Sequence, residues 1–361
     1  MKSSETAALF ERAETLKQKS RYQESLDLFQ KAMNGFRACK EVKGILECSL
    51  AIGDVHRMIG NYDAAGKSYV QAIEMATAMD DTVSLADAKA GFGLSLRGKG
   101  DWKTSLKMFR DALRFYRKNN DRHGTAFVLW AMAGALRIKG DILKAIETYH
   151  ESLKLFRSLR FRSAAGYCLC GLGGTSRIAG LFDDSLCYYT SANKLFADIK
   201  DTFGMAYSYC GTGNAFRMRG DFKKALLNFN RASALYKKIG DRVSYSYTLW
   251  SMGTTYKMLG DHEKAVHYFK TANKLFKQTK DPRGIVYCKL GLGEIAMIDG
   301  KKTLAEKYIT SSVTEAKKYG FSVEKCHAEL LLSALSGKLR KGCYNKLGLK
   351  LQFTGAPFNL P

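Results

Sequence analysis

Six basic side chains recur at intervals of 40 residues and carry the clearest chemistry in this chain. This basic column consists of Arg57, Arg97, Arg137, Arg177, Arg217 and Lys257. Guanidinium and ammonium groups bind carboxylates and phosphates, and the planar guanidinium does so through two parallel hydrogen bonds. Because five of the six residues are arginine, the column predicts a surface that recognises acidic groups of a ligand.

A structural interpretation of the same column remains open. A cation in the last turn of a helix is favoured by the helix macrodipole, by roughly 0.3–1 kcal/mol. Local ion pairs could neutralise four of the charges, because an aspartate stands four residues after each of Arg97, Arg137, Arg217 and Lys257. Arg177 separates the two interpretations best, since Leu181 stands where the aspartate would be.

Aromatic side chains form two more columns with the same period. The first holds Phe127, Tyr167, Tyr207, Tyr247 and Tyr287, and the second includes Trp130 and Trp250. Ten residues, or about 15 Å along a helix, separate the first aromatic column from the basic column, with small or polar residues such as Asn214 between them. A ligand with acidic groups on one side and apolar groups on the other would fit. Packing against a neighbouring helix is the alternative role of these rings.

Pairs of helices are the elements that must position these columns. In residues 201–240, Asp201 and Asp221 each stand at a helix start, where a carboxylate accepts hydrogen bonds from the free amides of the first turn. Gly220 ends the first helix, because glycine adopts the left-handed cap conformation without a Cβ penalty. Apolar residues of the second helix fall on one stripe. The repeat is therefore a helix, a glycine turn and a second helix.

This pattern returns eight times, which predicts a solenoid of stacked helix pairs and not one globular core. Turn glycines mark seven of the repeats, at Gly60, Gly100, Gly140, Gly180, Gly220, Gly260 and Gly300. A small residue, a turn glycine, alanine, an aromatic residue and alanine follow in the order Gly213, Gly220, Ala225, Phe229 and Ala232. On these residues the chain resembles the tetratricopeptide repeat (TPR) family over residues 5 to 320, in the long, 40-residue variety of Pins-type polarity adaptors.

The resemblance implies an all-α, right-handed α-α superhelix of about eight TPR helix pairs. Residues 1–320 would form the solenoid, residues 321–341 a capping helix and residues 342–361 a tail. The first helix of each pair lines the concave face of a TPR superhelix, so the basic and aromatic columns would line a groove. Three states of the tail remain open, namely a disordered end, a pairing strand, or a segment folded back onto the body.

The net charge of +24 favours acidic partners, namely acidic peptides, nucleic acid or an anionic membrane surface. Together with the resemblance, it predicts a scaffold or adaptor that binds an extended or helical, acidic segment of a partner protein in the groove. Two alternatives remain, which are binding of single-stranded RNA through the Arg and aromatic columns and sensing of a short signalling peptide. Lysines on the second helices, such as Lys223 and Lys302, spread the charge beyond the groove and weigh against RNA.

Nothing in the sequence points to catalysis, a cofactor or a metal site. The six histidines share no repeat column, and Cys168 and Cys170 lack a second pair at zinc spacing. No segment is apolar enough for a membrane span or a signal sequence. Several of the nine cysteines occupy helix-face columns, as small buried residues and not as disulfides. We therefore expect a non-enzymatic protein of the cytoplasm, whose partner and self-association stay open.

Overall fold

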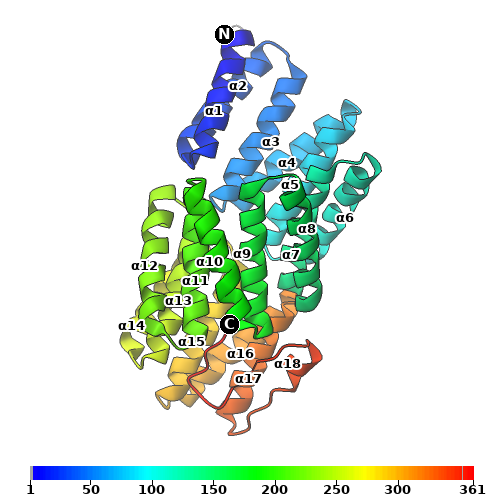
Figure 1. The fold of residues 1–361 in the computed structure, drawn as a ribbon. Helices are drawn as coiled ribbons and strands as arrows, with labels where there is room; N and C mark the ends of the chain where they lie inside the picture. Colours follow the sequence, from blue (N-terminus) through cyan, green and yellow to red (C-terminus); the bar gives the residue numbers. More distant parts are fainter. Residues whose placement is uncertain (1–2, 352) are drawn as a thin grey trace. The chain divides into compact units, whose positions relative to one another are not determined.

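The computed structural model describes residues 3–351 and 353–361, and the described chain consists of helices joined by short turns, followed by a non-helical stretch at the C-terminal end (Figure 1). Its first eight helices are α1 (Ser3–Gln18), α2 (Tyr22–Ala38), α3 (Val42–Met58), α4 (Tyr62–Ala78), α5 (Thr82–Gly98), α6 (Trp102–Lys118), α7 (Arg122–Lys139) and α8 (Ile142–Ser158). The others are α9 (Arg162–Ala179), α10 (Phe182–Asp198), α11 (Thr202–Met218), α12 (Phe222–Ile239), α13 (Arg242–Met258), α14 (His262–Gln278), α15 (Pro282–Ile298), α16 (Lys302–Tyr319), α17 (Ser322–Leu335) and α18 (Gly342–Lys346). The predicted all-helical fold of paired repeats is confirmed.

The helices form two compact units. The first unit comprises the described residues up to Ala131 together with Lys238–Asp241, and the second comprises Met132–Lys237 and Arg242–Pro361. The basic column is divided between them. Two of its members belong to the first unit and four belong to the second unit, which is the unit that also contains the C-terminal tail.

The predicted caps and turns are present in the repeat of α11 and α12. The Asp201 carboxylate accepts a hydrogen bond from Gly204 N at 2.8 Å, and the Asp221 carboxylate accepts one from Lys224 N at 3.1 Å. Gly220 has a φ of +81° and therefore occupies the left-handed region that glycine enters without strain. Local sequence thus determines where each of these helices begins and ends.

Glycines inside the helices let aromatic rings lie directly against the backbone. A Cβ on Gly173 of α9 would stand 2.7 Å from the Tyr189 ring, and one on Gly211 of α11 would stand 1.9 Å from the same ring. The Tyr189 ring is therefore held between two helices that only glycine allows so close. The same arrangement recurs at Tyr69 between Gly53 and Gly91, and at Phe269 between Gly253 and Gly291.

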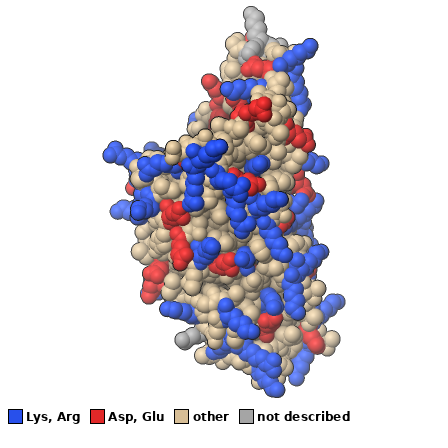
Figure 2. Space-filling view, turned by 90° about the vertical axis from the view of Figure 1, so that its right-hand side faces the viewer, with Lys and Arg blue, Asp and Glu red and all other residues tan. Residues whose placement is uncertain are grey.

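Basic side chains are spread over the surface. Figure 2 shows Lys and Arg across the visible face, with fewer Asp and Glu between them. Lys223 and Lys224 near the start of α12 and Lys237 near its end are exposed. The positive charge is therefore a property of the surface as well as of the basic column. In the described part of the chain, no helix is long and apolar enough to cross a bilayer.

The C-terminal tail folds back onto the second unit, which decides among the three states left open. Leu349, Leu351 and Phe353 are buried in one apolar core with Phe358, Leu360 and side chains of α8, α9, α15, α16 and α17. Lys350 N donates to the Ala179 carbonyl at 3.0 Å, so the tail contacts the end of α9. Helix α17 ends at Leu335, six residues before the predicted end of the capping helix at 341.

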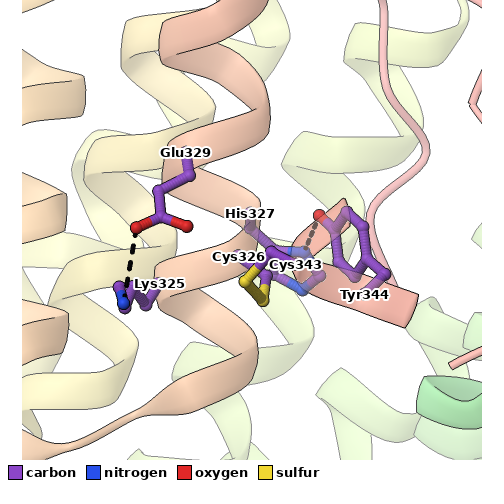
Figure 3. Close-up of a disulfide and its surroundings, with 6 residues drawn as sticks. All are labelled: Lys325, Cys326, His327, Glu329, Cys343 and Tyr344. Atoms are coloured by element: carbon purple, nitrogen blue, oxygen red, sulfur yellow. Dashed lines mark hydrogen bonds and ion pairs between the residues drawn. A yellow bond between two sulfur atoms is a disulfide. The ribbon is translucent and has the colours of Figure 1, made fainter. Parts of the chain in front are cut away.

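A disulfide joins the tail to α17, between Cys326 and Cys343 (Figure 3). Cys48, Cys168 and Cys288, which share one repeat column, are fully buried and form no disulfide, as predicted. Cys326 and Cys343 lie outside the cysteine columns, and their disulfide was not predicted from the sequence. The tail returns along α17, so that the Cα atoms of Cys326 and Cys343 lie 5.4 Å apart, which is within the usual range for a disulfide.

Candidate functional site

Four members of the basic column come together in the second unit. Arg137 lies on α7, Arg177 on α9, Arg217 on α11 and Lys257 on α13. Each one interacts electrostatically with the next along this series, Arg137 with Arg177, Arg177 with Arg217, and Arg217 with Lys257. Arg217 and Lys257 are 0% and 2% exposed. We refer to these four side chains and the residues that contact them as the basic site.

Arg217 binds a residue of the tail. Its Nη1 donates to Asn359 Oδ1, and Asn359 Nδ2 donates back to the Arg217 carbonyl at 2.8 Å. Nε and Nη2 of Arg217 donate to Asn214 Oδ1 at 3.3 and 3.2 Å. Burial and the neighbouring Arg177 both lower the pKa of Arg217. The guanidinium is thus held by two amide oxygens and by no carboxylate among the described residues.

Lys257 and Glu294 bind both main-chain groups of one tail residue. Lys257 Nζ lies 2.5 Å from Glu294 Oε2 and donates to the Phe358 carbonyl at 2.7 Å. Glu294 Oε1 accepts a hydrogen bond from Phe358 N. Burial lowers the pKa of Lys257, and Glu294 opposes that shift. The ion pair therefore presents one donor and one acceptor to a peptide group.

Arg137 and Arg177 have buried N–H groups without partners in the described chain. These groups are Nε of Arg137, and Nε and Nη1 of Arg177. A Cβ on Gly174 would stand 2.7 Å from Arg137 Nη1 and 2.9 Å from Tyr189 Oη, so glycine makes room for the guanidinium. Burial lowers the pKa of Arg177. A buried donor without a partner costs about 1–3 kcal/mol, and more when it is charged.

The two basic residues of the first unit have other partners. Arg57 Nη2 lies 3.0 Å from Asp54 Oδ1, within the same helix. Arg97 Nη1 donates to the Ala131 carbonyl at 3.2 Å, and its guanidinium lies 5.4 Å from the centre of the Trp130 ring. The Trp130 ring also stacks on Phe127, with centroids 5.9 Å apart. Arg57 and Arg97 thus connect residues of their own unit.

The aromatic column of the second unit joins successive repeats. Tyr167 Oη donates to Asp201, the cap of α11, at 3.1 Å. The Tyr247 side chain likewise forms a hydrogen bond with Asp281, the cap of α15, and burial raises the pKa of Tyr247. Tyr287 Oη donates to Glu324 of α17 at 2.7 Å. These contacts favour the packing role of the rings.

Three other predicted residues also lie in the second unit. Trp250 is buried beside Tyr287, with centroids 4.6 Å apart, and its ring centre lies 5.8 Å from the Arg217 guanidinium. Tyr207 is half-buried and interacts with Arg137. Asn214, besides accepting from Arg217, donates to Ser251 Oγ at 3.0 Å. Asn214 therefore orients the arginine from a neighbouring turn of the same helix.

The sequence model of the tetratricopeptide repeat matches residues 5–78, 84–158 and 204–278. The chain belongs to the tetratricopeptide repeat family. No curated protein matches it at a significant level. Its fold is similar to that of solved structures of low sequence identity, as the three structures described next illustrate.

The Rap conjugation gene regulator of plasmid pLS20, in complex with the Phr* peptide, is 11% identical with a TM-score of 0.67, over 87% of this chain and 95% of that one. A Rap protein complexed with Competence and Sporulation Factor is 14% identical with a TM-score of 0.62, over 96% and 99%. NprR in complex with its cognate peptide NprX is 14% identical with a TM-score of 0.59, over 91% and 99%. At these identities the likeness concerns the fold.

Two expectations about this TPR protein are wrong at the basic site. The Asp221 carboxylate forms its ion pair with Lys224 Nζ, at 2.9 Å, and not with Arg217. Asp261 pairs in the same way with Lys264 at 2.7 Å and not with Lys257. Arg217 and Lys257 lie in the last turns of α11 and α13, where the tail covers them. Both aspartates point to lysines one turn into their own helices.

Sequence reasoning missed the acidic member of the TPR site. Glu294 occupies the same repeat position as Gly134, Gly174, Asn214 and Thr254. The change to a carboxylate after four small or neutral residues in consecutive repeats was the available signal, because a buried carboxylate needs a partner. Phe358 and Asn359 carry no such signal, since they lie outside the repeats. The described residues contain no group of three metal-binding side chains of the His, Cys, Asp or Glu type.

Proposed function

We propose that this TPR protein is an adaptor whose second unit binds an extended, acidic segment of a partner protein at the basic site. The observation that carries the proposal is the binding of non-helical peptide there. Lys257 and Glu294 hold the carbonyl and N–H of Phe358, and Arg217 holds the side-chain amide of Asn359. Peptide groups are common to every protein segment, so the same contacts are open to another chain.

Unpaired positive charge supports an acidic ligand. Lys257 pairs with Glu294, and Arg283 pairs with Glu324 at 2.6 Å. Across the described residues, no carboxylate pairs with the guanidinium groups of Arg137, Arg177 or Arg217. Because a buried charge is stable only when it is paired and hydrogen-bonded, these arginines favour a ligand that brings carboxylates.

Sensing of a short signalling peptide is the second candidate. The three structures compared above are complexes, with Competence and Sporulation Factor, with the Phr* peptide and with the peptide NprX, and their fold resembles this one. The two candidates differ in the ligand, since an adaptor recognises an internal segment and a sensor recognises a free peptide with its charged ends. Single-stranded RNA is less well supported, because the site holds peptide groups of the tail and exposed lysines such as Lys223 and Lys237 spread the positive charge beyond it.

Two finer predictions stay proposals. The 40-residue spacing favours the Pins-type variety of TPR protein. The cytoplasm is the proposed compartment on the strength of the unpaired column cysteines. The Cys326–Cys343 disulfide argues against it, because disulfides persist mainly in oxidising compartments.

Fluorescence anisotropy with defined peptides tests the function. Peptides rich in Asp and Glu are compared with matched Asn and Gln versions, each with free and with blocked ends. We expect the acidic peptides to bind the wild type and to lose affinity for Arg137→Gln/Arg177→Gln. Arg57→Gln is the matched control, because Arg57 pairs with Asp54 in the first unit. Equal binding of acidic and neutral peptides, or full affinity in the double variant, would refute the proposal.

Blocking the peptide ends separates the two candidates. An adaptor should bind acidic peptides with blocked ends as well as peptides with free ends, because it recognises side chains and internal peptide groups. A sensor of a free peptide should lose most of its affinity when the ends are blocked, since terminal charges are then removed.

A further inference from the structure

The C-terminal segment, residues 342–361, occupies part of the basic site in the manner of a bound peptide. Its Phe358 is 1% exposed and its Leu360 is 4% exposed. Phe358 contributes both main-chain groups, and Asn359 contributes its side-chain amide, to contacts with three side chains of the solenoid. The last residues of the segment therefore contact two members of the basic column directly.

The other end of the segment is fastened to α17. Cys343 forms the disulfide with Cys326, and next to it Tyr344 Oη lies 2.7 Å from His327 Nδ1. Figure 3 shows the Tyr344 ring of α18 directed toward His327, beside the disulfide. Tyr344 then packs on Phe353, and Phe353 on Phe358, with ring centroids 5.5 and 5.8 Å apart. Aromatic contacts thus connect the fastened root to the residues in the site.

Some N–H groups of the basic site remain without a hydrogen-bond partner when the segment is bound. The segment meets Arg217 and Lys257, whereas buried N–H groups of Arg137 and Arg177 have no hydrogen-bond partner among the described residues. A peptide that reached all four cations would therefore make contacts that the segment does not make. Asn359 is neutral, so the segment brings no side-chain carboxylate to Arg217.

We propose that the C-terminal segment is a built-in competitor of the partner, and that its Phe358–Asn359 pair shows what the partner carries. The partner would present an aromatic residue followed by asparagine, with a carboxylate further along for Arg137 and Arg177. This inference rests on the proposed function. The partner must displace the segment, and a tethered competitor acts at an effective concentration in the millimolar range when its linker is short.

A synthetic peptide of residues 353–361, FTGAPFNLP, is the probe for the competition. Labelled with fluorescein, it is titrated with the full-length wild type and with full-length Phe358→Ala/Asn359→Ala. We expect the double variant to bind it at least about tenfold more tightly, because its own segment no longer fills the site. Lys346→Ala is the matched control, since Lys346 is an exposed residue of the same segment, and it should bind like the wild type.

Asn359→Ala alone removes only polar contacts and keeps the apolar packing of Phe358. It therefore keeps the test valid if the double variant does not fold. We expect it to bind the probe more tightly than the wild type and less tightly than the double variant. The proposal is overturned if the wild type binds the probe as tightly as both variants, or if neither variant binds it while circular dichroism remains that of the wild type.

The acidic peptides used to test the function separate the two ideas. If they bind the double variant and the probe does not, the competitor inference fails and the proposed function stands. If the probe binds the double variant and the acidic peptides do not, the segment fits the site but the acidic partner is wrong.

Discussion

Acidification should destabilise the second unit through His327. This side chain is 0% exposed, and its Nδ1 lies 2.7 Å from Tyr344 Oη at the root of the C-terminal segment. Burial lowers the pKa of His327 to about 4, with Glu324 opposing the shift and Arg283 and Arg177 adding to it. The Tyr287 ring also lies next to His327, with the two ring centroids 6.4 Å apart. His327 is therefore neutral in the folded protein at neutral pH.

The size of the effect follows from the difference between the folded and unfolded pKa. The unfolded chain takes up a proton as the pH falls below about 6.5, whereas the folded chain resists protonation until about pH 4. The contribution of the neutral histidine to stability is thus present above the unfolded value and is lost as the pH falls toward the folded value. Between about pH 7.5 and pH 5 the loss amounts to about 2 kcal/mol, rising to about 3 kcal/mol below pH 4.

Urea unfolding followed by circular dichroism at about pH 7.5 and pH 5 measures this loss. Other groups also titrate in that range, so the quantity to compare is the pH dependence of the wild type against His327→Gln. Glutamine keeps a hydrogen-bonding partner for Tyr344 but does not titrate. We expect the wild type to lose about 2 kcal/mol more than the variant. His267→Gln, which changes an exposed ring, should behave like the wild type. Equal pH dependence of wild type and His327→Gln would refute the reasoning.

Three further predictions concern packing, binding and the disulfide. Gly211→Ala places a Cβ 1.9 Å from the Tyr189 ring and should lower the free energy of unfolding by about 3 kcal/mol. Gly220→Ala should lower it by only about 1–2 kcal/mol, because its Cβ meets no atom within 4 Å and only the left-handed backbone is strained. Thermal melts that rank the two variants in the opposite order would contradict this prediction. Arg177→Gln should weaken binding of the acidic peptides by about 1.5–3 kcal/mol while leaving the melting temperature unchanged or higher, because a buried unpaired charge is removed. A lower melting temperature with intact affinity would instead assign Arg177 a structural role. Cys343→Ser should release the root of the segment and tighten binding of the FTGAPFNLP probe, and an unchanged affinity would show that the disulfide does not restrain the segment.

The sequence alone determined the helix pairs and their order. Capping by Asp201 and the positive φ of Gly220 are local properties, so a residue and its near neighbours suffice to predict them. The 40-residue recurrence then predicts stacking, because a lone helix pair cannot bury its apolar stripe. The presence of cations on successive first helices also followed from the spacing, and Glu294 could have been found as the carboxylate that follows four small or neutral residues in its column.

Only the tertiary structure decided what those cations contact. Lys257 meets Phe358 across 101 residues of chain, and Arg217 meets Asn359 across 142. Pairings over such separations leave no periodic trace, because the tail lies outside the repeats and its partners are set by the path of the whole second unit. Charge, spacing and the resemblance to TPR proteins predicted a basic groove open to a ligand. The folded chain instead placed its own C-terminal segment there, since the segment's apolar residues gain more by joining the core of α15 and α17 than by remaining in water.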